Sequence, residues 1–255
     1  MYLINEKKLI FKLKSLKKNQ NLIGIKSEFE TEGSSFEEVS NLRSITRLCN
    51  TKLFVKIGGV EAINDIYKCI EIGVDGIIAP MVESKFAAFK FIDFFKKKKL
   101  LKFPHLSINI ETKTGYENLS EILKICKGTI NNITVGRSDL SKSFFNKKVV
   151  PDSRAIQNII LDIAKKASKN GVTTTVGGSV SQNTIREFKK SKLLKKYIKK
   201  LETRKVILPV RSFLKGNSIE KALEFEKIYI LYKNEIIKFK SQTENERLSI
   251  LTTRV

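Results

Sequence analysis

The chain has 255 residues, 41% of them hydrophobic, so it can bury one substantial core and we expect a single main domain. Its formal net charge of +23 comes from 40 lysines and only 9 arginines. There is no tryptophan, and the basic runs 96–99 and 189–200 contain only one aromatic residue, Tyr197, which argues against specific nucleic-acid binding. No apolar run is long enough to cross a bilayer, and lysines interrupt the N-terminal apolar residues, so we expect a cytoplasmic protein without a membrane partner.

Short apolar strands alternate with amphipathic helices from about residue 22 to residue 210, the pattern of parallel βα units. We expect residues 1–21 to form a helical segment and residues 22–240 to form one TIM-type (β/α)8 barrel domain. The expected strands are 22–29, 52–57, 74–79, 106–111, 132–137, 172–177 and 203–208. An eighth strand could lie in residues 1–14 or near 225–231, although both segments favour helix.

The alternation of side chains within strands favours a barrel with a polar mouth. In residues 106–111, Leu106, Ile108 and Ile110 share one face, while the opposite face ends in Asn109 and Glu111. An open doubly wound sheet is the alternative, but its central strands would be apolar on both faces. Functional groups of barrels gather at the carboxyl ends of strands, where the sequence places Glu28, Glu30, Lys56, Glu111 and Asp139.

Candidate general bases lie on the first strand. The only histidine, His105, enters a strand at the end opposite the expected mouth and is therefore expected to be structural. A base must then be a carboxylate, a lysine of lowered pKa or metal-bound hydroxide, and Glu28, Glu30 and Lys26 are the candidates.

Two glycine pairs follow strands and are candidate substrate-binding positions. The backbone of Gly58 and Gly59, and that of Gly177 and Gly178, could approach a ligand and hold a carboxylate, or could simply turn the chain. Arg137 is a further candidate for contact with a charged substrate, as is Arg204, and either could instead form a structural ion pair.

Glu111 and Asp139 form the most informative pair of residues. They lie 28 residues apart, and each follows an apolar strand-like run. Two carboxylates at the ends of consecutive parallel strands can share one hard divalent cation and leave positions open for water and a chelating substrate. Helix capping by both acids is the alternative interpretation.

Three ordered motifs resemble the HpcH/HpaI aldolase and citrate lyase β-subunit family. They are residues 73–84 (GVDGIIAPMVES), 110–119 (IETKTGYENL) and 136–141 (GRSDLS). The resemblance implies that Glu111 and Asp139 hold Mg²⁺ or Mn²⁺, which chelates a pyruvate-like 2-oxo acid. It also implies a substrate-binding arginine where this chain has Lys56, and an early Asp-x-Glu-His motif where it has residues 28–31 (EFET).

The C-terminal part is expected to be helical. Apolar residues recur at three- and four-residue steps from 219 to 240, while residues 241–255 are expected to be flexible. The family resemblance implies C-terminal helices that reach a neighbouring subunit, and hence a homo-oligomer.

Together these patterns predict a metal-dependent carbon–carbon lyase or aldolase acting on a 2-oxo acid. One alternative is an aldolase in which Lys56 or Lys26 forms a Schiff base with the substrate. The other is a non-catalytic basic binding or assembly protein on the same barrel.

Overall fold

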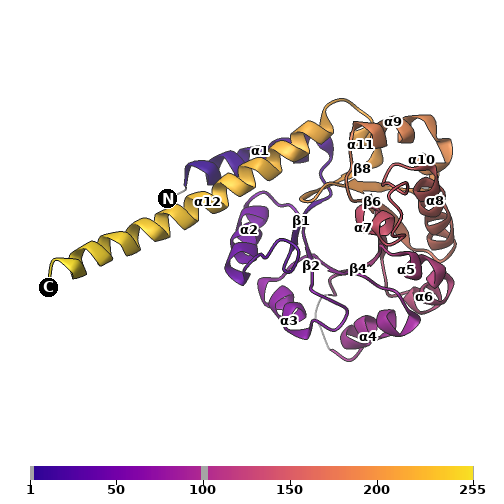
Figure 1. The fold of residues 1–255 in the computed structure, drawn as a ribbon, viewed down its shortest axis with the longest axis horizontal. Helices are drawn as coiled ribbons and strands as arrows, with labels where there is room; N and C mark the ends of the chain where they lie inside the picture. Colours follow the sequence, from indigo (N-terminus) through magenta and orange to yellow (C-terminus); the bar gives the residue numbers. More distant parts are fainter. Residues whose placement is uncertain (1–2, 99–102, 255) are drawn as a thin grey trace.

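The computed structural model describes residues 3–98 and 103–254. Within these residues, eight strands close a barrel in sequence order and helices surround it, which confirms the predicted barrel (Figure 1). The strands are β1 (Gly24–Glu28), β2 (Leu53–Lys56), β3 (Gly76–Ala79), β4 (His105–Ile110), β5 (Asn132–Gly136), β6 (Thr173–Gly177), β7 (Lys200–Glu202) and β8 (Val206–Pro209).

The larger helices of the barrel follow amphipathic stripes of the sequence, and several begin at a serine whose hydroxyl accepts a backbone N–H. The helices are α1 (Ile4–Gln20), α2 (Phe36–Leu48), α3 (Ile63–Ile72), α4 (Lys85–Lys96), α5 (Lys113–Glu117), α6 (Leu119–Cys126), α7 (Arg137–Lys142), α8 (Arg154–Lys169), α9 (Gln182–Lys190), α10 (Lys192–Tyr197), α11 (Val210–Phe213) and α12 (Ser218–Thr252).

The last two strands correct the sequence-based prediction. Residues 203–208 are not one strand, because residues 203–205 form a turn between β7 and β8. Of the two segments suggested for the eighth strand, residues 4–14 lie in α1 and residues 225–231 lie in α12, while residues 1–2 fall outside the described part of the chain. A three-residue connection is too short for a parallel crossover, so β8 runs antiparallel to both β7 and β1. The turn at 203–205 therefore lies at the barrel mouth.

The barrel lumen is layered. At its lower end, Phe54, Ile78 and Ile207 form an apolar cluster separate from the core under the helices. Above them, Asn132 donates to Ser107 Oγ (3.0 Å) and accepts from Thr175 Oγ1 (3.0 Å). The buried charged side chains Lys26, Glu28, Glu111 and Glu202 lie in the upper layer, while Lys200 lines the lower end together with Phe54 and His105.

Glycines in β1 and β3 make room for the lower layer. A Cβ at Gly24 or Gly76 would lie 2.5 or 2.3 Å from the Phe54 ring. His105 meets that ring edge-on, with centroids 5.6 Å apart, and burial together with Lys200 and Lys52 lowers the pKa of His105 to about 4. His105 thus lies at the amino ends of the strands, as expected.

The terminal helices lie side by side. Leu9, Leu13 and Leu16 of α1 are buried where α12 crosses it, and α12 then extends away from the barrel (Figure 1). Residues 241–252 continue this helix, although no regular structure is expected there from the sequence. No helix in the described part of the chain is long and apolar enough to span a membrane.

Candidate active site

A cavity of about 540 Å³ opens at the carboxyl ends of the strands. Charged and polar groups from β1, β2, β4, β5, β7, the β7–β8 turn and α12 line it. They include Lys26, Glu28, Lys56, Asn109, Glu111, Ser138, Asp139, Lys142, Ser179, Glu202, Arg204 and Glu226. The predicted metal pair and several predicted catalytic residues therefore meet in one hollow.

Glu111 is fixed at the end of β4 by two hydrogen bonds. Its Oε1 accepts from the backbone N–H of Met81 (3.1 Å) and its Oε2 accepts from the Asn109 amide (3.1 Å). Met81 has φ +51°, an uncommon conformation for a non-glycine residue, in the loop after β3. Gly136 is also required, because a Cβ there would lie 2.3 Å from Glu111 Oε2. The three family-like motifs thus meet around this carboxylate.

Asp139 reaches the same cavity from the first turn of α7. Its carboxylate is half-exposed, with Lys142 Nζ 3.9 Å from Oδ1. Burial raises the pKa of Glu111, and the Asp139 charge adds to this rise, while Lys56 and the Met81 N–H oppose it. A divalent cation between the two carboxylates would remove that repulsion.

The residues around the carboxylate pair fit a hard cation. Glu111 and Asp139 offer oxygen ligands, and the buried Asn109 Oδ1 has no hydrogen-bond partner among the described residues. Over residues 3–98 and 103–254, no cluster of three or more His, Cys, Asp or Glu could hold a metal, so water or substrate would complete the coordination sphere.

Three buried side chains, Lys26, Glu28 and Glu202, and the partly buried Lys56 form a series of alternating charges along the opposite wall. Lys56 Nζ lies 3.0 Å from Glu28 Oε2, and Glu28 Oε1 lies 3.2 Å from Lys26 Nζ. Lys26 Nζ also donates to Glu202 Oε1 at 2.7 Å. Lys26 thus forms ion pairs with two carboxylates, while Lys56 forms an ion pair with one.

These contacts set the protonation of the candidate bases. Burial favours a neutral Lys26, but Glu202 and Glu28 outweigh it and raise the pKa of Lys26. Burial likewise opposes the charge on Glu28, but Lys26 and Lys56 lower its pKa overall. Both side chains therefore stay charged near neutral pH, which suits them to stabilising charge and disfavours proton abstraction or amine attack.

Four predicted residues lie outside the cavity lining, namely Glu30, Gly58, Gly59 and Arg137. Glu30 is exposed and packs on Gly58, whose Cβ would lie 2.7 Å from Glu30 Cγ. The Gly58 N–H donates to Asp65 Oδ2 (2.9 Å), so a carboxylate of the chain itself occupies it. A Cβ added at Gly59 would have no other atom within 4 Å.

Arg137 points away from the cavity. Its guanidinium donates to Asp152 Oδ1 (2.6 Å), to the carbonyl oxygens of Gly177 (3.2 Å) and Gly178 (2.7 Å), and to Thr184 Oγ1 (3.1 Å). Of the two interpretations open from the sequence, this placement favours the structural ion pair. Gly177 and Gly178 do line the cavity, and Arg137 holds their loop in place.

Glu202 was not selected from the sequence. Its buried side chain packs on Gly177, where a Cβ would lie 2.8 Å from Glu202 Cγ. The sequence signal for Glu202 is its alternation with Lys200, but the predicted strand at 203–208 excludes both residues. Asn109 was seen only as a member of the polar face, and Ser138 and Ser179, whose hydroxyls lie 2.8 Å apart at the mouth, carry no sequence signal.

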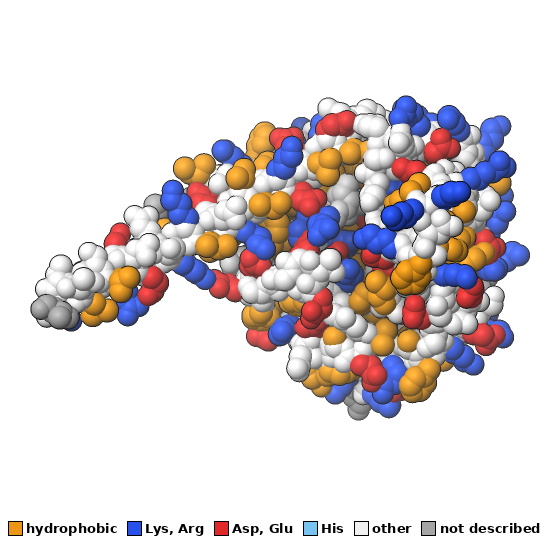
Figure 2. Space-filling view, in the orientation of Figure 1, with side chains coloured by type: hydrophobic (Ala, Val, Ile, Leu, Met, Phe, Trp, Pro, Cys, Tyr) orange, Lys and Arg blue, Asp and Glu red, His pale blue; other side chains and the backbone are white. Residues whose placement is uncertain are grey.

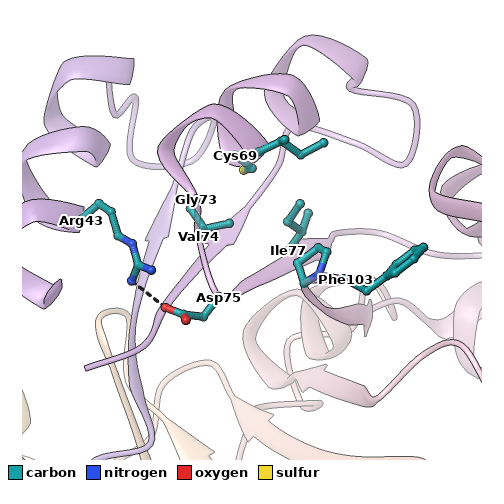
Figure 3. A pocket seen from close by; sticks show the side chains of 9 residues that line it. Arg43, Cys69, Gly73, Val74, Asp75, Ile77 and Phe103 are labelled. Carbon is teal, nitrogen blue, oxygen red and sulfur yellow. Dashed lines mark hydrogen bonds and ion pairs between the residues drawn. The ribbon is translucent and has the colours of Figure 1, made fainter. Parts of the chain in front are cut away.

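A second hollow, of about 180 Å³, lies near the amino end of β3 (Figure 3). Its polar feature is the Arg43–Asp75 ion pair (2.6 Å), and Asp75 Oδ2 also accepts the Leu53 N–H. The buried, unpaired Cys69 lines it, and burial raises the pKa of this thiol to about 12. None of the predicted site residues lines this hollow.

Comparison with known proteins agrees with the geometry. The model of the HpcH/HpaI aldolase/citrate lyase family matches residues 37–191. An HpcH/HpaI aldolase from Desulfitobacterium hafniense DCB-2 is 13% identical, with a TM-score of 0.61, over 79% of this chain and 82% of that one. An HpcH/HpaI aldolase/citrate lyase family protein from Burkholderia cenocepacia J2315 is 10% identical, with a TM-score of 0.62, over 86% and 90%. The citrate synthase SbnG is 13% identical, with a TM-score of 0.61, over 92% and 90%. No curated protein matches the sequence.

The closed barrel and its charged mouth define a protein of the α/β-barrel class with its candidate site at the strand carboxyl ends. Because the family model covers more than half of the chain, the protein belongs to the HpcH/HpaI aldolase/citrate lyase family.

Proposed function

We propose that the protein is a metal-dependent carbon–carbon lyase or aldolase acting on a 2-oxo acid. The observation that carries this proposal is the meeting of Glu111 and Asp139 in one cavity, with Glu111 held by Met81 and Asn109 and its pKa raised. Two carboxylates at such a mouth, beside an unpartnered amide oxygen, suit Mg²⁺ or Mn²⁺.

The bound ion would supply Lewis acidity towards the carboxylate and keto oxygens of the substrate. Cleavage of a 4-hydroxy-2-oxo acid removes the 4-hydroxyl proton and breaks the C3–C4 bond. The bonding electrons pass to the 2-oxo acid fragment as an enolate, which then takes a proton at C3. The other fragment leaves as an aldehyde.

Lys56 is the proposed cationic contact for the developing enolate charge. Its ammonium lies at the end of β2, lines the cavity, pairs with Glu28 (3.0 Å) and donates to Thr31 Oγ1 (3.4 Å). Glu28 retains Lys26 if Lys56 turns towards a substrate, so no buried carboxylate would be left unpaired. Lysine offers a point charge rather than the planar fork of the family arginine, which affects substrate orientation.

Metal-dependent proton exchange at the methyl group of pyruvate tests the proposal. We expect exchange in deuterated water with Mg²⁺ or Mn²⁺ and none with chelator. Glu111→Gln and Asp139→Asn should each lower the rate by at least about 100-fold, because each removes a charged ligand. Glu117→Gln, which changes an exposed carboxylate on α5, is the matched control.

Calorimetry with Mn²⁺ gives a readout independent of turnover, and both site variants should bind the ion more weakly. If the wild-type protein shows neither exchange nor metal binding, the proposed function is wrong. Borohydride trapping with pyruvate tests the Schiff-base alternative: a lysine adduct that forms despite chelator would favour that chemistry instead.

A further inference from the structure

We infer that Arg204, on the β7–β8 turn, binds a second anionic group of the substrate at the side of the cavity opposite the metal carboxylates. The substrate class is then a 2-oxo acid that carries another carboxylate or similar anion at its far end. This inference rests on the proposed function, because it assigns the near end of the substrate to Glu111 and Asp139.

The turn is built to hold one side chain at the mouth. Thr203 is buried, and it exchanges hydrogen bonds with Val206, which donates to Thr203 Oγ1 (3.1 Å) and accepts from the Thr203 N–H (3.0 Å). Lys205 is buried too; it pairs with Glu32, and its Nζ lies 4.5 Å from the centre of the Tyr229 ring. Arg204 alone is exposed within residues 201–208, and it lines the cavity.

Its position in the barrel separates it from the metal pair. In the closed ring, β8 lies four strands from β4 in either direction, so the turn that begins β8 faces the end of β4 across the mouth. Glu111 follows β4, and Asp139 follows the next strand. The cavity of about 540 Å³ is several times larger than a three-carbon acid requires, so a longer molecule can lie between the two sides.

The other cavity cations have another role or lie on the metal side of the cavity. Lys26 lies within 3.2 Å of two buried carboxylates, and Lys56 pairs with Glu28 and is the proposed contact for the enolate. Lys142 lies beside Asp139, one of the two proposed metal ligands. Arg204 has a single loose contact, from Nε to Glu226 Oε1 at 3.9 Å. Its two terminal nitrogens form no hydrogen bond with any residue in 3–98 or 103–254, so the planar fork that matches a carboxylate is open.

An apolar side chain lies beside this cation. Leu223, one turn before Glu226 on α12, lines the same wall and is 44% exposed. A leucine next to an arginine suits a ligand whose methylene groups precede its terminal anion. Since α12 supplies this wall, the C-terminal helix shapes the substrate-binding side of the cavity.

Paired ligands that differ only at the far end test the inference. We would measure binding by calorimetry, with Mg²⁺ present, for 2-oxoglutarate against 2-oxopentanoate and for 2-oxoadipate against 2-oxohexanoate. The wild-type protein should bind at least one diacid about tenfold or more tightly than its monoacid, because a charge-assisted, two-point contact is gained. Arg204→Gln should reduce that ratio to about twofold or less, and Arg204→Lys should retain part of it.

Arg247→Gln on the exposed far half of α12 is the matched control, because it removes the same charge away from the cavity. In this control, the ratio of diacid affinity to monoacid affinity should stay at the wild-type value. A wild-type ratio near one, no measurable diacid binding, or a ratio that Arg204→Gln leaves unchanged would overturn the inference. If the ratio depends on Arg204 but pyruvate exchange is absent, the proposed function fails and the second anion position stands.

Discussion

At the scale of single residues, the unequal sharing of charge in the cavity wall predicts unequal costs of mutation. Lys26 lies between Glu202 and Glu28, so Lys26→Met leaves a buried carboxylate without any cation and should cost about 3–5 kcal/mol of unfolding free energy. Lys56→Met leaves Glu28 paired with Lys26 and should cost only about 1–2 kcal/mol. Urea unfolding of the metal-free proteins at pH 7 measures both values.

The loss of unfolding free energy caused by Lys56→Met should depend on pH, and this dependence provides a control. Lys26 and Lys56 lower the folded-state pKa of Glu28 below its ordinary value of 4.5. The stabilisation by Glu28 is therefore fully present above pH 4.5 and is lost as the pH falls through the folded-state pKa. The difference between wild type and Lys56→Met should shrink in that acid range. If Lys56→Met costs as much as Lys26→Met at pH 7, the shared-cation description is wrong.

At the scale of elements, α12 has two halves with different surroundings. Phe225, Tyr229 and Tyr232 are buried against the body of the protein, while every residue from 241 to 254 is exposed. Removing the residues after Lys240 should leave the thermal unfolding midpoint nearly unchanged. Phe225→Ala should cost about 3–5 kcal/mol, because it opens a cavity under the helix.

The same truncation tests the predicted homo-oligomer. Leu248, Ile250 and Leu251 are each more than half exposed on the far part of α12, as a surface that contacts another copy would be. Sedimentation of the full chain and of residues 1–240 should show a smaller particle for the shorter chain. If the two proteins form particles with the same number of chains, this part of α12 carries no subunit contact.

At the scale of the whole molecule, lysines and arginines are spread over the barrel face and the helical arm, with acidic residues among them (Figure 2). A net charge of +23 without a base-stacking surface predicts weak, unselective attraction to nucleic acid. Affinity for unrelated duplexes should be similar and should fall by at least about tenfold between 50 and 200 mM salt. Selective binding that persists at physiological salt would instead favour the binding-protein alternative.

Much of the barrel followed from local sequence. Six strands fell where apolar alternation placed them, because a residue's face in a strand depends only on its neighbours in the chain. Glu111 and Asp139 were found because motifs of fixed spacing mark the ends of consecutive strands, and consecutive parallel strands are neighbours in space. The helix from residue 219 was likewise visible in its apolar period.

Closure of the barrel and the full composition of the mouth depended on tertiary structure. The antiparallel β8 fills the ring between β7 and β1, and no local pattern distinguishes a strand at 203–208 from a turn followed by a strand. The pairing of Lys26 with Glu202 joins residues 176 positions apart, and Arg204 meets Glu226 of α12 only after the helix packs beside the turn. Sequence thus determined which residues could carry charge into the lumen, while the pairing of those charges was decided by the closed ring, because it brings the first and last strands together.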